Sequence, residues 1–370
     1  MKRPGRSPVL ILAGGTGGHV YPALAIAQWL MRMNVPVVWM GTRAGLEARI
    51  VPEAGIVIDW LSISGLRGKG MLAWVLAPWR LNLAIAQALR IMLRYRPCVV
   101  LGMGGFVAGP GGVAAFLLSK PLVVHEQNAI AGLTNRLLSP LCDRLLEGFP
   151  GSFKSAKARH VGNPVRQEIS SLPDPRQRFA HRQGSLHLLV LGGSLGAQAL
   201  NEIVPQAVSR LPEQSRPRLW HQAGNRNITE AQARYEKFKL KARVEAYIED
   251  MACAYAWADL VLCRAGALTV AELCAAGVGA VLVPYPYAVD DHQRANARFM
   301  VETGAGILVT QSELTVNRLL RCLRLERSRL LEMAIAARGL AKADAAEVVA
   351  RISLDAAQHK GRSAEQDERP

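Results

Sequence analysis

Three glycine-rich segments of this sequence contain groups that could bind phosphate or take part in catalysis. The first, GGTGGHV (14–20), follows an apolar run, precedes a helical pattern and contains His19. Bare backbone amides at the N-terminus of a helix form a site for anions such as phosphate. The helix dipole disfavours protonation of an imidazole in the first turn, so His19 is a candidate general base.

Two further loops have a similar composition. The segments GMGGFVAGPGG (102–112) and GGSLGAQALN (192–201) each follow an apolar run. Their glycines allow a bulky group, such as a phosphate or pyrophosphate, to approach the main chain closely. Loops of this kind in both halves of the chain predict two phosphorylated ligands that face one cleft.

The C-terminal half carries two segments suited to a nucleotide sugar. In RAGALTVAEL (264–273), a glycine turn leads into a helix whose start holds Thr269 and Glu272. The amides there suit a diphosphate, and the carboxylate can accept two hydrogen bonds from ribose hydroxyls. The segment DDHQRAN (290–296) offers carboxylate, imidazole and amide groups that suit sugar hydroxyls.

Several enzyme classes lack their motif. The first loop is not GxGxxG, and the second apolar run ends at Trp39, Met40 and Gly41, where a dinucleotide site needs an acidic residue. NAD and FAD enzymes are therefore disfavoured. No GxxxxGK[ST] segment occurs, which excludes a P-loop nucleotidase at the motif level. The six cysteines form no CxxC pair, and no metal site is predicted.

One competing enzyme class stays open. Residues 192–196 match GxSxG, the nucleophile elbow of α/β-hydrolases, with Ser194 as the nucleophile. Asp259 and His292 follow Ser194 in the order of a hydrolase triad. This alternative leaves the two N-terminal glycine loops without a role.

The elements that position these loops alternate between short apolar runs and helical patterns. Runs such as VLILAGG (9–15) and, in a second series, LHLLVLGGS (186–194) are continuously apolar, as in parallel strands buried on both faces. The predicted fold class is therefore α/β, with two Rossmann-like doubly wound domains in tandem. We expect domains at 1–162 and 163–340, a last helix at about 341–356 and a disordered tail at 357–370.

The positive charge is concentrated in the first half of the chain. The 370 residues have a formal net charge of +16, and residues 1–160 carry 18 Lys and Arg against 6 Asp and Glu. A basic surface attracts nucleic acid, anionic lipid or a phosphorylated substrate. Aromatic residues make up 6% of the chain, which is low for stacking on single-stranded nucleic acid. A nucleic-acid-binding protein is the non-enzyme alternative.

Seven segments resemble, in their order, the MurG family of bacterial N-acetylglucosaminyltransferases: GGTGGHVYPALA, MGGFVAGPGG, HEQNA, HVGNPVR, GGSLGAQALN, CRAGALTVAEL and DDHQRAN. The resemblance implies the GT-B fold, two Rossmann-like domains with a C-terminal helix that crosses back to the first. It implies inverting transfer of N-acetylglucosamine from UDP-N-acetylglucosamine to the C4 hydroxyl of lipid I, which gives lipid II. UDP-N-acetylglucosamine is a substrate, no cofactor is implied, and the absence of a DxD motif fits a metal-independent reaction.

The resemblance also assigns site residues. It implies that His19 is the base, with Glu126 in second place. It implies that Gly14, Gly15, Gly104 and Gly105 bind the acceptor pyrophosphate. The donor contacts that it implies are Thr16, Gly17, Gly18, Asn128, Arg166, Ser194, Ile248, Ala267, Leu268, Thr269, Val270, Ala271, Glu272 and Gln293. His292 stands where the family pattern has Gln.

Residues 66–96 predict the membrane contact that a polyprenyl acceptor requires. Apolar and basic side chains are interleaved there, and both Trp and basic residues favour an anionic lipid surface. The predicted patch consists of Leu72, Trp74, Val75, Trp79, Lys69 and Arg80. The resemblance implies peripheral attachment to the cytoplasmic face of the bacterial inner membrane, with other cell-wall synthesis proteins as further partners and no nucleic acid.

Overall fold

The computed structural model describes residues 7–63, 65, 75–193 and 196–367. The chain forms two compact units. The N-terminal unit holds residues up to Arg166 and those from Asp344 onward, and the C-terminal unit runs from Gln167 to Ala343. The corresponding boundaries expected from the sequence lie near residues 162 and 340.

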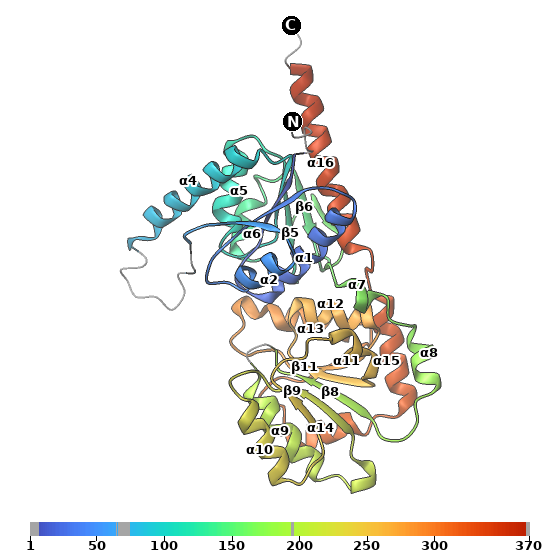
Figure 1. The fold of residues 1–370 in the computed structure, drawn as a ribbon. Helices are drawn as coiled ribbons and strands as arrows, with labels where there is room; N and C mark the ends of the chain where they lie inside the picture. The colour runs from blue at the N-terminus through green and yellow to red at the C-terminus, as the bar shows by residue number, and fades with distance from the viewer. Residues whose placement is uncertain (1–6, 64, 66–74, 194–195, 368–370) are drawn as a thin grey trace. The chain divides into compact units, whose positions relative to one another are not determined.

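The N-terminal unit is built on a parallel sheet. Among its described residues, seven strands lie in the order β3-β2-β1-β4-β5-β6-β7, and Figure 1 shows helices on either side of this sheet. They are β1 (Val9–Leu12), β2 (Val37–Gly41), β3 (Val57–Trp60), β4 (Val99–Gly102), β5 (Leu122–Glu126), β6 (Arg144–Glu147) and β7 (Ala158–His160). The helices are α1 (Gly17–Arg32), α2 (Glu47–Glu53), α4 (Ala77–Tyr95), α5 (Ala108–Leu117), α6 (Leu133–Leu138) and α16 (Ala345–Asp367).

Both faces of this sheet are buried. Val9 and Ile11 of β1 pack in one apolar cluster with α1 and α16. Leu10 and Leu12 of the same strand point to the other face and pack with α4 and α5. Because successive side chains of a strand alternate between faces, burial on both sides explains why the run is apolar at every position.

The C-terminal unit repeats this plan. Its described residues form a six-stranded parallel sheet in the order β10-β9-β8-β11-β12-β13. The strands are β8 (His187–Leu191), β9 (Arg218–Gln222), β10 (Arg243–Glu245), β11 (Leu260–Cys263), β12 (Gly279–Leu282) and β13 (Gly306–Leu308). The helices are α7 (Gln167–Ser170), α8 (Pro175–Ala180), α9 (Gln198–Ser209), η1 (Glu213–Ser215), α10 (Ile228–Lys237), α11 (Met251–Trp257), α12 (Ala267–Ala276), η2 (Val289–Asp291), α13 (His292–Val301), α14 (Val316–Leu323) and α15 (Arg327–Gly339). The two sheets confirm the predicted α/β fold class.

The last helix, α16, packs in the N-terminal unit, as the family resemblance implies. Val349 and Ala350 of α16 are fully buried in the same cluster as Val9 and Ile11. The helix continues to Asp367, whereas the sequence led us to expect a tail without regular structure from residue 357. The segment is polar but rich in residues with good helix propensity, which extend a helix already anchored by packing.

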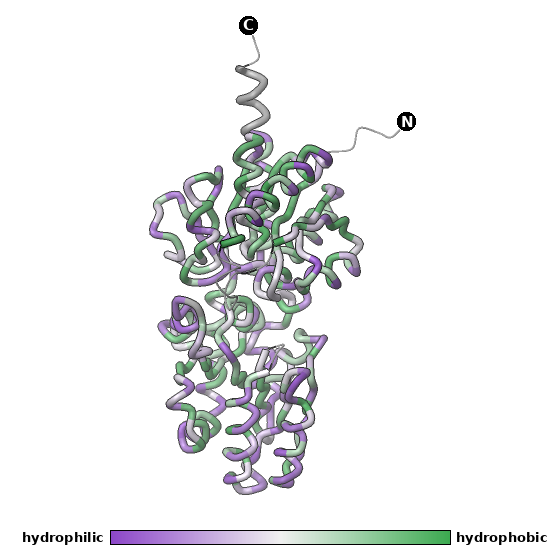
Figure 2. The backbone as a smooth tube through the Cα atoms, turned by 90° about the vertical axis from the view of Figure 1, so that its left-hand side faces the viewer, coloured by the Kyte–Doolittle hydropathy of each residue, from purple (hydrophilic) through white to green (hydrophobic). Residues whose placement is uncertain are grey.

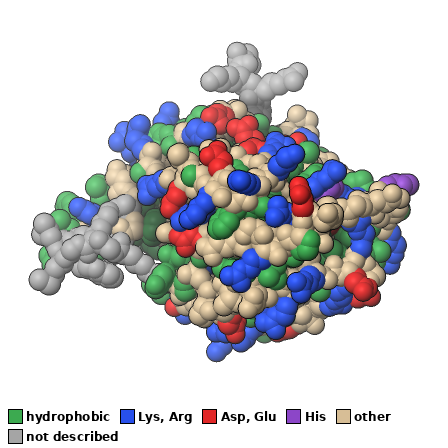
Figure 3. Space-filling view, turned by 90° about the horizontal axis from the view of Figure 1, so that it is seen from below, with side chains coloured by type: hydrophobic (Ala, Val, Ile, Leu, Met, Phe, Trp, Pro, Cys, Tyr) green, Lys and Arg blue, Asp and Glu red, His purple; other side chains and the backbone are tan. Residues whose placement is uncertain are grey.

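Hydropathy along the chain follows the same layering. In Figure 2, hydrophobic segments lie mainly in the interior of each unit, and hydrophilic segments lie mainly at the outer turns. The face seen in Figure 3 carries Lys and Arg interspersed with Asp and Glu. That face therefore has mixed charge rather than the single positive sign typical of a nucleic-acid-binding surface.

The glycine loops follow strands at the centre of each sheet. In the N-terminal unit, the loops after β1 and β4 leave neighbouring strands whose helices α1 and α5 begin directly afterwards. In the C-terminal unit, the loops after β8 and β11 have the same relationship. The strand order reverses at these two points, which is where open parallel sheets bind ligands.

Candidate functional site

The buried side chain of Glu47 stabilises the first glycine loop. This carboxylate is fully buried, and it accepts hydrogen bonds from the Gly15 amide at 2.9 Å and from the amide and hydroxyl of Thr42 at 2.9 and 2.8 Å. A Cβ atom on Gly14 would lie 2.6 Å from Oε1 of Glu47. The Gly15 amide, predicted to bind pyrophosphate, is therefore already bonded within the protein.

The second glycine loop packs against the first. Gly105 has φ +79°, and a Cβ atom there would lie 2.4 Å from the carbonyl oxygen of Gly14. Gly104 has φ +89°, and a Cβ atom there would lie 2.9 Å from the ring of His19. Glycine at these positions lets the two loops touch and lets the imidazole lie against the backbone.

The start of α1 offers the amides that the loop leaves for a ligand. Thr16 is the N-cap, with extended backbone (φ −103°, ψ 159°) and no side-chain capping hydrogen bond. The first N–H groups of a helix have no partner within the helix. Arg166 lies over the ring of Tyr21, with the guanidinium carbon 5.6 Å from the ring centroid, and this adds a positive charge near the first turn of α1.

His19 is half-buried in the first turn of α1 and is hydrogen-bonded to the end of β5. Its Nδ1 atom lies 2.7 Å from Oε1 of Gln127. Gln127 is 1% exposed, and its Nε2 atom lies 3.0 Å from both Nδ1 and the carbonyl oxygen of His125. The base predicted from sequence is thus oriented by a buried amide that the sequence analysis did not single out.

Glu126 organises the loop after β5. The side chain is 1% exposed, and its Oε1 atom accepts hydrogen bonds from the Asn128 amide at 2.9 Å and from the Asn128 side chain at 3.2 Å. Its Oε2 atom accepts from the Gly132 amide at 3.0 Å and from Asn135 Nδ2 at 2.8 Å. Both oxygens accept hydrogen bonds within the protein, so the geometry argues against Glu126 as the base. The side chain instead stabilises the conformation of residues 126–135.

In the C-terminal unit, Glu272 is presented by the start of α12. Gly266 is the N-cap of this helix, with extended backbone (φ −64°, ψ 145°) and no side-chain capping bond, so the first amides of α12 lie where the sequence predicts a diphosphate. Glu272 is 6% exposed and accepts a hydrogen bond from the hydroxyl of Tyr255 at 3.1 Å. Tyr255, on α11, is a positioning residue that the sequence analysis missed because 17 residues separate the pair.

Two other residues predicted to bind the donor already form hydrogen bonds within the protein. Gln293 Oε1 accepts a hydrogen bond from the Tyr285 amide at 2.9 Å. The NH₂ group of Gln293 is therefore the group that would donate to a sugar hydroxyl. The Ile248 amide donates to Oε1 of Gln222 at 3.0 Å, and Ile248 is 1% exposed. Gln222 was also missed by the sequence analysis.

The remaining predicted donor residues lie in two groups. Ala267, Leu268, Thr269, Val270 and Ala271 form the first turns of α12 with Glu272. Thr16, Gly17, Gly18, Asn128 and Arg166 belong to the N-terminal unit, and their contact with the donor stays a prediction. Ser194 lies outside the described residues.

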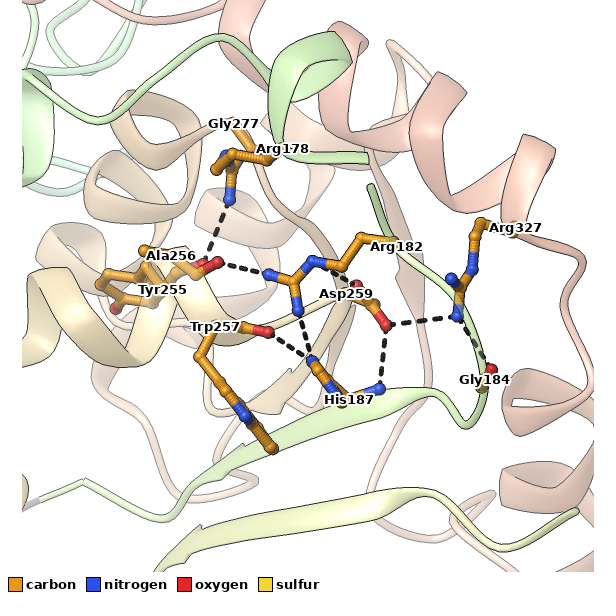
Figure 4. A network of polar contacts seen from close by, with 10 residues as sticks. All are labelled: Arg178, Arg182, Gly184, His187, Tyr255, Ala256, Trp257, Asp259, Gly277 and Arg327. Atoms are coloured by element: carbon orange, nitrogen blue, oxygen red, sulfur yellow. Dashed lines mark hydrogen bonds and ion pairs between the residues drawn. The ribbon is translucent and has the colours of Figure 1, made fainter. Parts of the chain in front are cut away.

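The hydrolase alternative fails on the position of Asp259. This residue precedes β11, and its carboxylate accepts a hydrogen bond at 2.9 Å from the amide of His187, the first residue of β8. Residues 192 and 193, the described start of the GxSxG segment, follow the last residue of β8, at the opposite end of that strand. Asp259 is fully buried and lies 3.5 Å from Arg182 and 3.8 Å from Arg327 (Figure 4). It therefore ties the segment after α8 and the start of α15 to the sheet. This position, at the end of β8 away from residues 192 and 193, does not suit the acid of a triad with Ser194.

The predicted membrane patch is described in part. Leu72, Trp74 and Lys69 lie outside the described residues, whereas Val75, Trp79 and Arg80 are exposed, with Trp79 73% exposed. Further exposed apolar residues lie on α5, which packs against α4, and on α6, which packs against α5. They include Phe116, Leu117, Leu133 and Leu137, each more than half exposed. We call the exposed apolar residues of α4, α5 and α6 the apolar surface.

Two further features of the described residues concern membrane and metal chemistry. Within the part of the chain that the structure describes, no helix is long and apolar enough to span a bilayer. Among the same residues, no group of three or more His, Cys, Asp or Glu side chains is arranged to hold a metal ion. The expectation of a metal-independent reaction without a cofactor stays a prediction.

Comparison with known proteins agrees with this geometry. Residues 9–146 match the N-terminal domain of glycosyltransferase family 28, and residues 187–349 match its C-terminal domain. The chain is 56% identical over 353 residues to the UDP-N-acetylglucosamine–N-acetylmuramyl-(pentapeptide) pyrophosphoryl-undecaprenol N-acetylglucosamine transferase of Nitrosococcus oceani, covering 94% of this chain and 98% of the relative. The similarly named protein of Methylococcus capsulatus is 55% identical over 353 residues, covering 94% and 98%.

Solved structures extend the comparison to the fold. The crystal structure of Acinetobacter baumannii MurG is 40% identical, with a TM-score of 0.82, covering 94% of this chain and 99% of that one. The glycosyltransferase SnogD from Streptomyces nogalater is 19% identical, with a TM-score of 0.64, covering 95% and 100%. At that level of identity the second likeness concerns the fold alone.

Proposed function

The chain belongs to glycosyltransferase family 28, and we propose that it transfers N-acetylglucosamine from UDP-N-acetylglucosamine to lipid I, undecaprenyl-pyrophosphoryl-MurNAc-pentapeptide. The product is lipid II, a precursor of peptidoglycan and hence of growth, cell shape and division. The names of relatives that match nearly the whole chain support this activity.

The observation that carries the proposal is the buried carboxylate of Glu272 on α12. A buried carboxylate held by the hydroxyl of Tyr255 is a group that can accept hydrogen bonds from vicinal ribose hydroxyls. The first amides of the same helix suit the diphosphate of the donor, because a helix N-terminus stabilises negative charge. The same amides stabilise the UDP leaving group as its charge develops.

His19 acts as the base in this reaction. Its Nε2 atom takes the proton of the C4 hydroxyl of the acceptor as that oxygen attacks the anomeric carbon and UDP leaves. A single displacement inverts the configuration and requires one base, without a covalent sugar intermediate. The start of α1 and Arg166 provide positive charge for the acceptor pyrophosphate or for the donor.

The acceptor keeps its polyprenyl chain in the bilayer, so the enzyme must work at a membrane surface. We assign this contact to the apolar surface of α4, α5 and α6, where Trp79 and Leu137 are 73% and 65% exposed. Exposed arginines, Arg80, Arg90 and Arg136, lie on α4 and α6, and each basic residue near an anionic surface contributes about 1 kcal/mol. We place the reaction at the cytoplasmic face of the bacterial inner membrane, where other cell-wall synthesis proteins are candidate partners.

Calorimetric titration of the purified protein tests the donor assignment. UDP-N-acetylglucosamine is compared with UDP-glucose and NAD⁺, for the wild type and for Glu272→Ala. We expect selective binding of UDP-N-acetylglucosamine that weakens at least about 10-fold in the variant, since a hydrogen bond to a charged group contributes about 1.5–3 kcal/mol. Equal affinity for the two UDP-sugars, or full affinity in Glu272→Ala, would contradict the assignment.

A further inference from the structure

A chain of hydrogen bonds runs from a backbone carbonyl in the interior of the N-terminal unit to the ring of His19. His125 Nε2 lies 2.9 Å from the carbonyl oxygen of Gly162. Gln127 Nε2 lies 3.0 Å from His125 Nδ1 and 3.0 Å from the His125 carbonyl oxygen. Gln127 Oε1 lies 2.7 Å from His19 Nδ1. We call these three side chains the His125–Gln127–His19 relay.

The two carbonyl oxygens fix the direction of every bond in the relay. A carbonyl oxygen only accepts, so the Gln127 atom beside the His125 carbonyl must be the NH₂ group and not the amide oxygen. The amide oxygen then faces His19, and because it also only accepts, His19 Nδ1 must carry a proton. At the other end, the Gly162 carbonyl requires a proton on His125 Nε2. His125 Nδ1 is thereby left as the acceptor for Gln127.

His125 can accept the hydrogen bond from Gln127 because its imidazole stays neutral. The side chain is fully buried, and burial lowers the pKa of His125 to about 4. A neutral imidazole with its proton on Nε2 is the only form that both donates to Gly162 and accepts from Gln127. A charged imidazole would donate from both nitrogens and would turn the Gln127 NH₂ group away.

We propose that Gln127, backed by His125, is a positioning residue that holds neutral His19 in the Nδ1–H tautomer, so that Nε2 presents its lone pair to the acceptor hydroxyl. Gly104 contributes the space for this arrangement, because its missing side chain leaves room for the His19 ring. Gln127 carries no charge, so it selects the tautomer without adding the carboxylate that many catalytic histidines have as a partner. The inference rests on the proposed role of His19 as the base.

Nitrogen NMR of histidine-labelled protein tests the relay directly. The chain has 8 histidines, and long-range ¹H–¹⁵N correlations distinguish the protonated nitrogen of each neutral ring. His19 is assigned by comparison with His19→Gln, at about pH 8.5, well above the ordinary histidine pKa of about 6.5. We expect His19 as the Nδ1–H tautomer and His125 as the Nε2–H tautomer. Nε2–H as the main form of His19 would overturn the proposal.

Gln127→Met removes the acceptor while keeping a side chain of similar length. We expect the Nε2–H form of His19 to become populated and kcat to fall roughly 10²-fold, within the range of about 10²–10⁴ that general base catalysis contributes, with KM for UDP-N-acetylglucosamine unchanged. Ser152→Ala is the matched control, since Ser152 is also buried and bonds to the carbonyl of Asn128 in the neighbouring loop without joining the relay. It should retain the wild-type His19 tautomer and kcat.

The outcomes separate the relay from the proposed function. A Gln127→Met protein with the wild-type tautomer and kcat would overturn the relay, and if this variant does not fold, the spectrum of the wild type still decides. His125→Asn should retain the wild-type tautomer, because its side-chain oxygen replaces the Nδ1 acceptor. A correct tautomer in a protein whose His19→Gln variant transfers sugar at the wild-type rate would instead contradict the role of His19 as base.

Discussion

The hydroxyl of Tyr255 donates a hydrogen bond to Oε2 of Glu272 at 3.1 Å, and both side chains are excluded from solvent. This contact helps to hold the carboxylate in place at the second turn of α12. Because the Glu272 side chain is already held in one conformation, it loses less conformational entropy when the ribose binds.

Removing that hydroxyl should weaken donor binding. Tyr255→Phe is expected to raise the Kd for UDP-N-acetylglucosamine by about 3-fold to 10-fold, because the hydrogen bond holds Glu272 and does not itself touch the sugar. Calorimetry measures the change. Tyr235→Phe is the control, since Tyr235 is also buried in the C-terminal unit and bonds to His221. A similar loss of affinity in both variants would assign the effect to general destabilisation.

Gly104→Ala should lower the rate of sugar transfer by displacing His19. The added Cβ atom would lie 2.9 Å from the imidazole ring, at φ +89°. Gly151→Ala is a matched control, because Gly151 has φ +79° and its added Cβ atom would have no heavy atom within 4 Å. Both variants should lose about 1–2 kcal/mol of unfolding free energy from the left-handed conformation, but only Gly104→Ala should lower kcat. Equal activity of the two variants would show that the space at Gly104 does not serve the base.

Charges in the apolar surface should weaken membrane binding. The double variant Trp79→Glu with Leu137→Glu should bind anionic vesicles at least about 10-fold more weakly, since burying one large apolar side chain contributes about 1.5–3 kcal/mol. Sedimentation with vesicles measures binding, and activity on a short-chain, water-soluble acceptor should be unchanged. Met33→Glu is the control, because Met33 is 54% exposed at the end of α1. Undiminished binding by the double variant would remove α4 and α6 from the membrane contact.

Two buried histidines should make the protein less stable in acid. Burial lowers the pKa of His125 to about 4 and that of His221 to about 3, whereas an unfolded histidine titrates near pH 6.5. The unfolded state therefore binds protons first, and the free energy of unfolding decreases as pH falls below about 6.5, by about 2.5 kcal/mol for each histidine at about pH 4.5. The loss levels off below the lower pKa of the folded state.

Denaturant unfolding at about pH 7 and pH 4.5 measures this dependence. His221→Phe should reduce the difference between the two pH values, whatever its effect on stability at neutral pH. His181→Phe, at an exposed position, should leave the difference as it is in the wild type. A difference in His221→Phe as large as in the wild type would contradict the account.

The sequence predicted the architecture because its signals are local. The continuous apolar run of residues 9–12 and the glycines that follow it mark a buried parallel strand and a strand-to-helix turn without reference to distant residues. The start of α12 and Glu272 were located in the same way. The last helix extends further than the expected 341–356, because composition alone does not reveal that packing at Val349 and Ala350 anchors it.

What the sequence could not predict depends on long-range partners. The Gly15 amide bonds to Glu47, 32 residues away, and His19 bonds to Gln127, 108 residues away. Neither spacing has a periodic signature. Glu126 looked like a base because it is a carboxylate at a strand end, and only the positions of Gly132 and Asn135 reveal that its oxygens are occupied.

Transfer of labelled sugar is the most direct test of the central claim. The wild type and His19→Ala are incubated with UDP-[¹⁴C]N-acetylglucosamine and a lipid I analogue, and the labelled lipid product is counted. We expect transfer by the wild type and a loss of about 10²–10⁴ in kcat for His19→Ala, with unchanged affinity for the UDP-sugar. No transfer by folded wild-type protein that binds UDP-N-acetylglucosamine would contradict the proposed reaction, and full activity of His19→Ala would contradict the proposed base.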